Sequence, residues 1–164
     1  MTSKIKNRHR LKNKEIREIL NELKETFSSD FFDIKSSVEC GDFEGTRIVL
    51  VNDEPCFMYY QDRIVFTLHG LNKYKPKKQF VVVDMGAVKF VTNGADVMAA
   101  GIVDADENIE KGDQVWICDE THHKPLAVGI ALINSEEMIN SETGKAVKNV
   151  HYVGDNLWNL SGSI

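Results

Sequence analysis

Short apolar runs joined by turn dipeptides in the first half of the chain restrict its fold more than any other feature. The runs are TRIVLV (46–51), PCFMYY (55–60) and RIVFTL (63–68). Each has the length of a β-strand, whereas a helix needs about ten residues or more. Asn52-Asp53 and Gln61-Asp62 separate the runs and have the residue types of hairpin turns. We therefore predict a small antiparallel sheet, with a further extended segment at 34–39.

Residues 13–27, NKEIREILNELKETF, have the periodicity of an amphipathic helix. The apolar positions are Ile16, Ile19, Leu20, Leu23 and Phe27. Charged residues occupy the other side, and Asn13 is the expected N-cap. The pattern predicts a helix that rests on the sheet.

The polar run NKYKPKKQ at 72–79, which contains Pro76, interrupts these patterns. We predict a domain boundary there, with an N-terminal domain at 1–76 and a second domain at 77–164. A central strand opens the second half, and further strands are expected near 95–103, 114–118, 125–133 and 149–153. Ser135 is expected to start a short helix. The predicted fold class is α+β, with a second half whose short strands close into a small barrel.

The stretch DMGAVKFVTNGADVMAAGI at 84–102 concentrates three glycines among short apolar runs. Asp84 can cap a helix over about 86–92, which Gly94 can end in the left-handed conformation. The competing interpretation makes VKFV a strand. A turn at Asn93-Gly94-Ala95 would leave backbone N–H groups open to phosphate and sugar. The structural alternative is a helix C-cap and a β-bulge without a ligand.

The charge distribution is uneven although the net charge is −5. Residues 4–17 contain seven cations and one acid, and a second lysine-rich group runs from Lys73 through Lys77 and Lys78 to Lys89. Residues 96–142 are strongly acidic, and Lys145, Lys148 and His151 follow. This distribution suits a protein with one basic binding face, and ordinary solvated surface is the alternative.

Signatures of catalysis and of metal binding are missing from the sequence. Phosphate-binding loop motifs are absent, and the calcium-like run DADEN at 104–108 has Ile109 where the loop requires glycine. Three widely separated cysteines favour neither a disulfide framework nor a zinc site. The longest apolar run, LAVGIALI, is too short to span a bilayer. We expect a soluble, cytoplasmic protein without catalytic activity, metal or cofactor.

Several separated motifs resemble the PUA domain, an RNA-binding β-barrel, over about residues 79–160. They are VVVDMGAVKFVTNGADVMAAGI, LAVGIALINSEEM and NVHYVGDNLWNL. Gly94, Ala95, Met98 and Gly101 match the glycine–alanine, methionine and glycine pattern of that domain. Ala100 stands where many members have proline. LNKYKP and the HYVGDNLW ending are similar to the malignant T-cell amplified sequence family and to archaeal stand-alone PUA proteins.

The resemblance implies a pre-PUA domain followed by a PUA pseudo-barrel, in a non-catalytic translation factor. Such a factor would act at the small ribosomal subunit and the tRNA acceptor end, in initiation, reinitiation or recycling. The resemblance implies that the protein binds RNA and that a separate protein with a SUI-type domain acts with it. We expect the protein itself to be a monomer. The alternative is the RNA-docking subunit of a pseudouridine- or archaeosine-type tRNA-modifying enzyme, with catalysis on another chain. The candidate RNA-binding residues are Lys73, Lys77, Lys78, Lys89, Asn93, Gly94, Ala95, Met98, Gly101, Lys145, Lys148 and His151.

Overall fold

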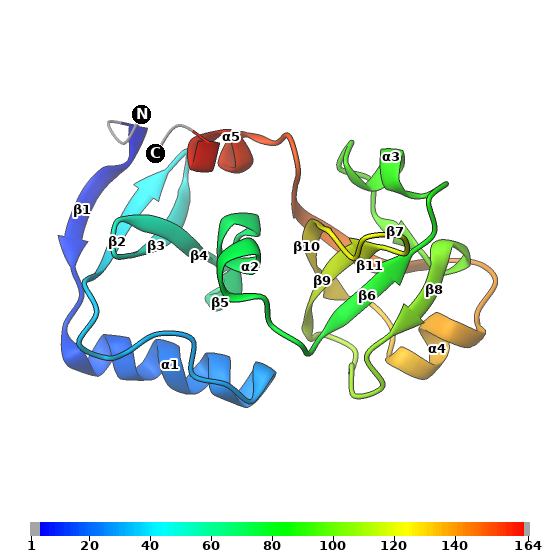
Figure 1. The fold of residues 1–164 in the computed structure, drawn as a ribbon, viewed down its shortest axis with the longest axis horizontal. Coiled ribbons are helices and arrows are strands. Elements are labelled where there is room, and N and C mark those ends of the chain that lie inside the picture. Colours follow the sequence, from blue (N-terminus) through cyan, green and yellow to red (C-terminus); the bar gives the residue numbers. More distant parts are fainter. Residues whose placement is uncertain (1–3, 163–164) are drawn as a thin grey trace. The chain divides into compact units, whose positions relative to one another are not determined.

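The computed structural model describes residues 4–162, and the chain divides between Lys75 and Pro76 (Figure 1). Unit 1 consists of the chain up to Lys75 and of the segment that begins at Asn156, whereas unit 2 is Pro76–Asp155. The expected second domain, 77–164, therefore differs from unit 2 at its C-terminal end. Helix α5 (Asn156–Gly162) groups with unit 1 because it contacts α2 (Leu68–Tyr74), and Asn156 Nδ2 donates to Glu44 Oε1 at 2.8 Å.

The described residues of unit 1 form an antiparallel sheet in the order β1-β2-β3-β4-β5. Its strands are β1 (Lys6–Arg10), β2 (Val38–Phe43), β3 (Thr46–Val51), β4 (Glu54–Tyr60) and β5 (Arg63–Phe66). The turns predicted at Asn52-Asp53 and Gln61-Asp62 connect β3 to β4 and β4 to β5. All four turn residues have φ between 50° and 68°. Positive φ at both central residues is typical of type I′ turns, so the predicted hairpins are confirmed.

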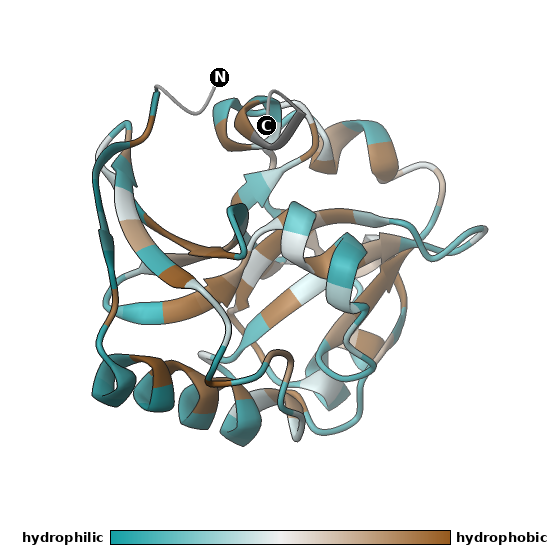
Figure 2. Ribbon diagram, turned by 60° about the vertical axis from the view of Figure 1, so that its left-hand side comes forward, coloured by the Kyte–Doolittle hydropathy of each residue, from teal (hydrophilic) through white to brown (hydrophobic). Residues whose placement is uncertain are grey.

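Helix α1 (Asn13–Phe27) is confirmed and packs against β5. Its buried side chains are Ile16, Ile19, Leu23 and Phe27. Brown and teal segments alternate along α1 in Figure 2, as expected for a helix with one buried side. The N-cap prediction was wrong by one position: Lys12 is the N-cap residue, and its N–H donates to the Glu15 carboxylate at 3.1 Å.

Three features of unit 1 differ from the sequence prediction. The extended segment predicted at 34–39 was correct only at 38–39, because β2 begins at Val38 and residues 34–37 precede it. Strand β1 was missed because KNRHR contains no apolar residue; its pairing with β2 creates the strand. Helix α2 was missed because it is short. Thr67 stabilises its start by accepting from Gly70 N at 3.0 Å while donating to Pro55 O at 2.6 Å.

The described residues of unit 2 form a curled sheet in the order β7-β11-β10-β9-β6-β8, in which only β6 and β9 are parallel. Its strands are β6 (Phe80–Val83), β7 (Val97–Met98), β8 (Ile102–Ala105), β9 (Gln114–Asp119), β10 (Pro125–Ala131) and β11 (Lys145–Tyr152). Small and β-branched side chains fill its core, among them Val81, Val83, Ile117, Ala127 and Val147. The half-barrel confirms the expected α+β fold.

The glycine-containing stretch 84–102 forms a short helix rather than a strand at VKFV. Asp84 Oδ1 accepts from Ala87 N at 2.9 Å in the turn before α3 (Val88–Val91). Gly94 has φ +90°, as expected for a residue that ends a helix. The single strand expected at 95–103 is instead β7, the 3₁₀ turn η2 (Ala99–Gly101) and the start of β8.

The predicted helix at Ser135 is confirmed as α4 (Ser135–Asn140). Asn134 is its N-cap: the side-chain oxygen accepts from Glu137 N at 2.9 Å, and Asn134 N donates back to the Glu137 carboxylate at 3.2 Å. Between residues 4 and 162, none of the helices is long and apolar enough to cross a membrane.

Candidate functional site

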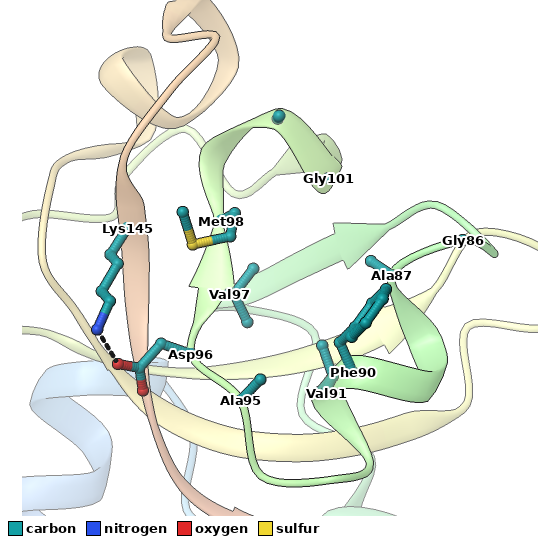
Figure 3. Close-up of a pocket in the computed structure, with 11 residues that line it drawn as sticks. Gly86, Ala87, Phe90, Val91, Ala95, Asp96, Val97, Met98, Gly101 and Lys145 are labelled. Carbon is teal, nitrogen blue, oxygen red and sulfur yellow. Dashed lines mark ion pairs between the residues drawn. The ribbon is translucent and has the colours of Figure 1, made fainter.

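A cavity of about 690 Å³ opens between α3, the β7–η2 segment and the first residue of β11 (Figure 3). It is lined by Gly86, Ala87, Phe90, Val91, Ala95, Asp96, Val97, Met98, Ala100, Gly101 and Lys145. Every lining residue except Lys145 comes from the stretch 84–102. The volume lies in the range of pockets that hold small organic groups, and most of the lining is apolar.

Two large apolar side chains of this lining are exposed. Phe90 of α3 is 58% exposed and Met98 of β7 is 47% exposed. In Figure 3 these two side chains come from the segments on either side of the cavity. An exposed aromatic ring and a polarizable thioether beside a cavity are suited to contact a flat ring system.

Positive charge lies at the rim of the cavity. Lys145 Nζ lies 3.2 Å from Asp96 Oδ2, and the Lys145 side chain is 62% exposed. Lys89 Nζ lies 5.2 Å from the centroid of the neighbouring Phe90 ring. The N–H of Asn149, which donates to the Asp96 carboxylate, lowers the pKa of that carboxyl, and the ion pair with Lys145 lowers it further. Lys145 is thus exposed but paired with Asp96, and Lys89 adds an exposed cation next to the lining residue Phe90.

Asn149 of β11 holds the loop between α3 and β7 in place. Its Nδ2 donates to Val91 O at 3.1 Å and to Ala95 O at 3.0 Å. Its backbone N donates to Asp96 Oδ1 at 2.9 Å. Its own Oδ1 is buried and, within the described part of the chain, has no hydrogen-bond partner. These bonds fix one wall of the cavity in advance, which lowers the entropy lost when a ligand binds.

The glycines of this stretch have a structural explanation. A Cβ on Gly94 would lie 2.9 Å from two atoms of the Tyr152 ring, and a Cβ on Gly101 would lie 3.2 Å from Ala87 Cβ. Packing against Tyr152 and the positive φ therefore explain Gly94, and tight packing against Ala87 favours a small residue at Gly101, both independently of any ligand.

Comparison with known proteins assigns both halves of the chain. The PUA domain family matches residues 79–153, and a domain of unknown function (DUF1947) matches residues 7–74. An uncharacterized protein of Methanocaldococcus jannaschii is 47% identical over 160 residues, which cover 96% of this chain and 99% of that protein. Malignant T-cell-amplified sequence 1 of Danio rerio is 31% identical over 121 residues, or 71% of this chain and 67% of that protein. The chain belongs to the family of PUA-domain proteins that includes malignant T-cell-amplified sequence 1.

Two further relatives support the assignment of the chain to this family. Translation machinery-associated protein 20 of Saccharomyces cerevisiae is 31% identical over 121 residues, covering 70% of this chain and 67% of the yeast protein. The crystal structure of a hypothetical protein from Pyrococcus horikoshii has a TM-score of 0.86 at 39% identity, covering 94% of this chain and 99% of that one. The PUA domain implies RNA binding, and named relatives are associated with translation. The cavity lies within the segment that matches the PUA domain.

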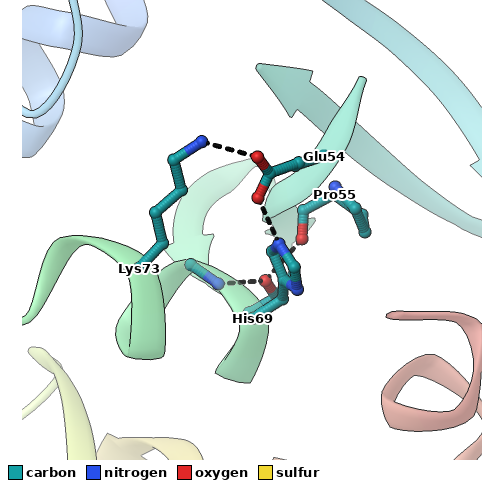
Figure 4. Close-up of polar contacts among 6 residues, drawn as sticks. Glu54, Pro55, His69 and Lys73 are labelled. Carbon is teal, nitrogen blue, oxygen red and sulfur yellow. Dashed lines mark hydrogen bonds and ion pairs between the residues drawn. The ribbon is translucent and has the colours of Figure 1, made fainter. Parts of the chain in front are cut away.

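Lys73, one of the candidate RNA-binding residues, lies outside the PUA domain. It belongs to α2 of unit 1, and its Nζ contacts Glu54 Oε1 at 2.8 Å (Figure 4). His69 Nε2 lies 2.6 Å from the other oxygen of the same carboxylate. Hydrogen bonds from Lys73 and His69 lower the pKa of Glu54. Lys73 thus ties α2 to β4, a structural role that the lysine-rich run did not indicate.

The other candidates of the PUA domain fall into three groups. Ala95, Met98, Gly101 and Lys145 line the cavity, and Lys89 contacts the lining residue Phe90. Asn93 and Gly94 form the turn beside it, and Lys77, Lys78 and Lys148 are exposed but do not line it. Only the first two groups are brought together by the fold.

His151 does not fit the prediction of an RNA-contacting side chain. It is 1% exposed, and its Nδ1 lies 2.8 Å from Asp155 Oδ2. His151 lies opposite the buried Val128 of β10, and its side chain therefore belongs to the interior and not to the surface. The structure therefore corrects this assignment.

The sequence analysis missed Phe90, Asp96 and Asn149. Phe90 was assigned to the helix but not to its exposed side; Val88 and Val91, three residues apart, share the buried side, which leaves Phe90 outside. Asp96 and Asn149 carry no local signal, because their roles depend on a contact across more than fifty residues.

The described residues were expected to hold neither a metal site nor a reactive cysteine. No set of three His, Cys, Asp or Glu side chains within them is close enough to hold a metal ion. All three cysteines are free and buried. Burial raises the pKa of Cys56 to about 11 and that of Cys118 to about 12, so both are poor nucleophiles at neutral pH.

Proposed function

We propose that this protein is a non-catalytic translation factor whose PUA cavity receives unpaired nucleotides at the acceptor end of tRNA on the small ribosomal subunit. The observation that carries the proposal is a preformed apolar cavity with an exposed aromatic ring, an exposed thioether and two exposed lysines at its rim. Single-stranded RNA is recognised by stacking of splayed bases on such side chains, while cations contact the phosphates.

The shape of the site favours an unpaired end over a duplex. A base in a helix cannot enter a cavity unless it is first unstacked, which costs a few kcal/mol. A nucleotide at an unpaired end is available without this cost. Phe90 and Met98 would contact the base, and Lys89 and Lys145 its phosphates.

The translational context rests on the relatives, since the name of one describes association with the translation machinery. We place the protein in the cytoplasm, in initiation, reinitiation or recycling. A factor with a SUI-type domain would join it in trans, and the protein itself would be a monomer. Co-sedimentation with purified small ribosomal subunits tests this context. A protein that remains in the supernatant at low salt while binding free tRNA would favour a role in tRNA modification instead.

Two charge variants at the cavity test the RNA site. Ala95→Glu places a carboxylate in the lining, and Lys89→Glu reverses a charge at the rim. Both positions are exposed, so we expect wild-type melting temperatures. We expect each variant to lose affinity for a single-stranded oligonucleotide ending in CCA by about fivefold or more, as when one hydrogen bond to a charged group is removed. Fluorescence anisotropy at fixed salt measures it.

Matched controls carry the same charge changes elsewhere in the PUA domain. Asn140→Glu adds one acid at the end of α4, and Lys111→Glu reverses an exposed lysine; neither residue lines the cavity. Both controls should bind the oligonucleotide like the wild type. If the cavity variants are stable and bind as well as the controls, the cavity is not the RNA site.

A further inference from the structure

Unit 1 carries a strongly basic surface that the PUA cavity does not explain. It follows β1 and the first turns of α1, which directly succeed one another along the chain (Figure 1). Its exposed cations are Lys4, Lys6, Arg10, Lys12, Lys14 and Arg17. Within residues 4–162, none of these six forms an ion pair. We call this set the β1–α1 surface.

Three acids of unit 1 contact side chains of β1. Arg8 Nη2 contacts Glu39 Oε1 at 2.7 Å and Asp53 Oδ1 at 2.8 Å. Asn7 Nδ2 donates to Asp42 Oδ2 at 3.1 Å. Arg8 therefore offsets part of the charge of Glu39 and Asp53, whereas Asp42, opposite Lys6, keeps its charge. The six cations of the β1–α1 surface remain exposed to solvent.

Structural needs explain only part of this surface. β1 is an edge strand, and charged residues on an edge prevent pairing with another chain. That accounts for Lys6 and Arg10 but not for the cations that continue into α1. Cations in the first turn of a helix are unfavourable because of the helix dipole, so helix stability does not explain Lys12 or Lys14.

A row of cations on an acidic protein fits a polyanion. The chain has a net charge of −5, so this local concentration of cations differs in sign from the chain as a whole and would attract an RNA. Lys6 and Arg10 lie on β1, and Lys14 and Arg17 are neighbours on one side of α1. We propose that the β1–α1 surface is a second RNA-binding site, which contacts the phosphodiester backbone of a double-helical RNA without reading its bases.

RNA fits this surface better than an anionic membrane does. A helix that lies on a membrane inserts an apolar side next to its cations. In α1 the apolar residues Ile16, Ile19, Leu23 and Phe27 are buried in unit 1, which leaves no apolar side to insert. The inference rests on the proposed function only in supposing that the protein works on RNA; it concerns a different unit of the chain.

The decisive variant is Lys6→Ala/Arg10→Ala/Lys14→Ala in the full-length protein. Lys35→Ala/Lys111→Ala/Lys124→Ala is its control, since it removes three exposed lysines from other places. The probes are a blunt 20-base-pair RNA duplex and the single-stranded CCA oligonucleotide. We expect the β1–α1 variant to bind the duplex at least tenfold more weakly than the control. Its salt slope should be smaller by about 0.7–0.9 for each phosphate that the variant no longer neutralises. Binding of the oligonucleotide should be unchanged.

The outcomes separate this inference from the proposed function. Equal duplex affinity and salt slope in both triple variants would overturn the β1–α1 site, whatever the oligonucleotide does. A wild-type protein that binds the duplex but not the oligonucleotide would overturn the cavity and leave this site standing. Binding to phosphatidylserine vesicles with no binding to duplex would assign the surface to membranes. If the melting curve shows that the triple variant does not fold, the double variant Lys12→Ala/Arg17→Ala replaces it. Its duplex affinity and salt slope are then compared with those of the control.

Discussion

Gly94 faces the ring of Tyr152 so closely that a Cβ at residue 94 would lie 2.9 Å from two ring atoms. Gly94 also has φ +90°, a conformation that strains other residues. We therefore expect Gly94→Ala to lose about 2 kcal/mol of unfolding free energy or more, from backbone strain and from displacement of the ring. Urea denaturation measures the loss.

Gly144→Ala is the matched control for this prediction. Gly144 has φ +92°, but an added Cβ would meet nothing within 4 Å. It should lose only about 1–2 kcal/mol, the cost of the left-handed backbone. Equal losses in the two variants would mean that Tyr152 moves aside without cost and that its packing does not require the glycine.

Phe90→Ala tests stacking at the cavity. The ring is 58% exposed, so its removal should change the unfolding free energy by less than about 0.5 kcal/mol. If a base stacks on it, affinity for the CCA oligonucleotide should fall by about 1–3 kcal/mol. Ile139→Ala removes a comparably exposed apolar side chain on α4 and should leave the affinity unchanged. Identical oligonucleotide binding by the two variants would argue against Phe90 as a stacking platform.

Asp96 makes the stability of the PUA domain depend on pH. The Asn149 N–H, and then Lys145, lower the pKa of the folded carboxyl below its unfolded value of about 3.9. The resulting stabilisation is complete above the unfolded pKa and is lost as the pH falls through the folded pKa. Asp96→Asn should therefore be less stable than the wild type near neutral pH. That difference should shrink in urea titrations below about pH 4, and a constant difference would exclude the linkage.

Lys73 should behave differently from its neighbours Lys77 and Lys78. Because it is paired with Glu54, Lys73→Ala should lower stability by up to about 1 kcal/mol and leave RNA affinity unchanged. Lys77→Ala/Lys78→Ala should keep the stability but flatten the salt dependence of RNA binding. Anisotropy titrations at several salt concentrations, with thermal melts, separate the two effects. A loss of RNA affinity in Lys73→Ala would show that Lys73 contributes to RNA binding.

The fragment 76–155 should fold alone. The core of unit 2 consists of residues between Val81 and Tyr152. A fragment of 79–164, in contrast, would keep α5 without α2, the helix it contacts. Leu157 and Leu160, buried in the full chain, would then be exposed. We expect cooperative urea unfolding for 76–155 and stronger binding of an apolar dye to 79–164. A non-cooperative 76–155 fragment would show that the PUA domain depends on unit 1.

Local sequence signals were sufficient where neighbouring residues decide the conformation. Asn52-Asp53 and Gln61-Asp62 specify tight turns, the apolar spacing of 13–27 specifies α1, and Gly94 specifies the end of α3. The family resemblance rested on the same kind of evidence, since its motifs are short and contiguous. Each of these signals lies within a few residues of the structure it predicts.

Long-range contacts decided the rest. KNRHR becomes a strand because β2 pairs with it, and His151 is buried because of the side of β11 on which it lies. One wall of the cavity is held by Asn149, which bonds to Val91 and Ala95 more than fifty residues away. Hydrogen bonds and packing between distant segments leave no periodic trace in the sequence. Their positions follow only from the way the sheet brings those segments together.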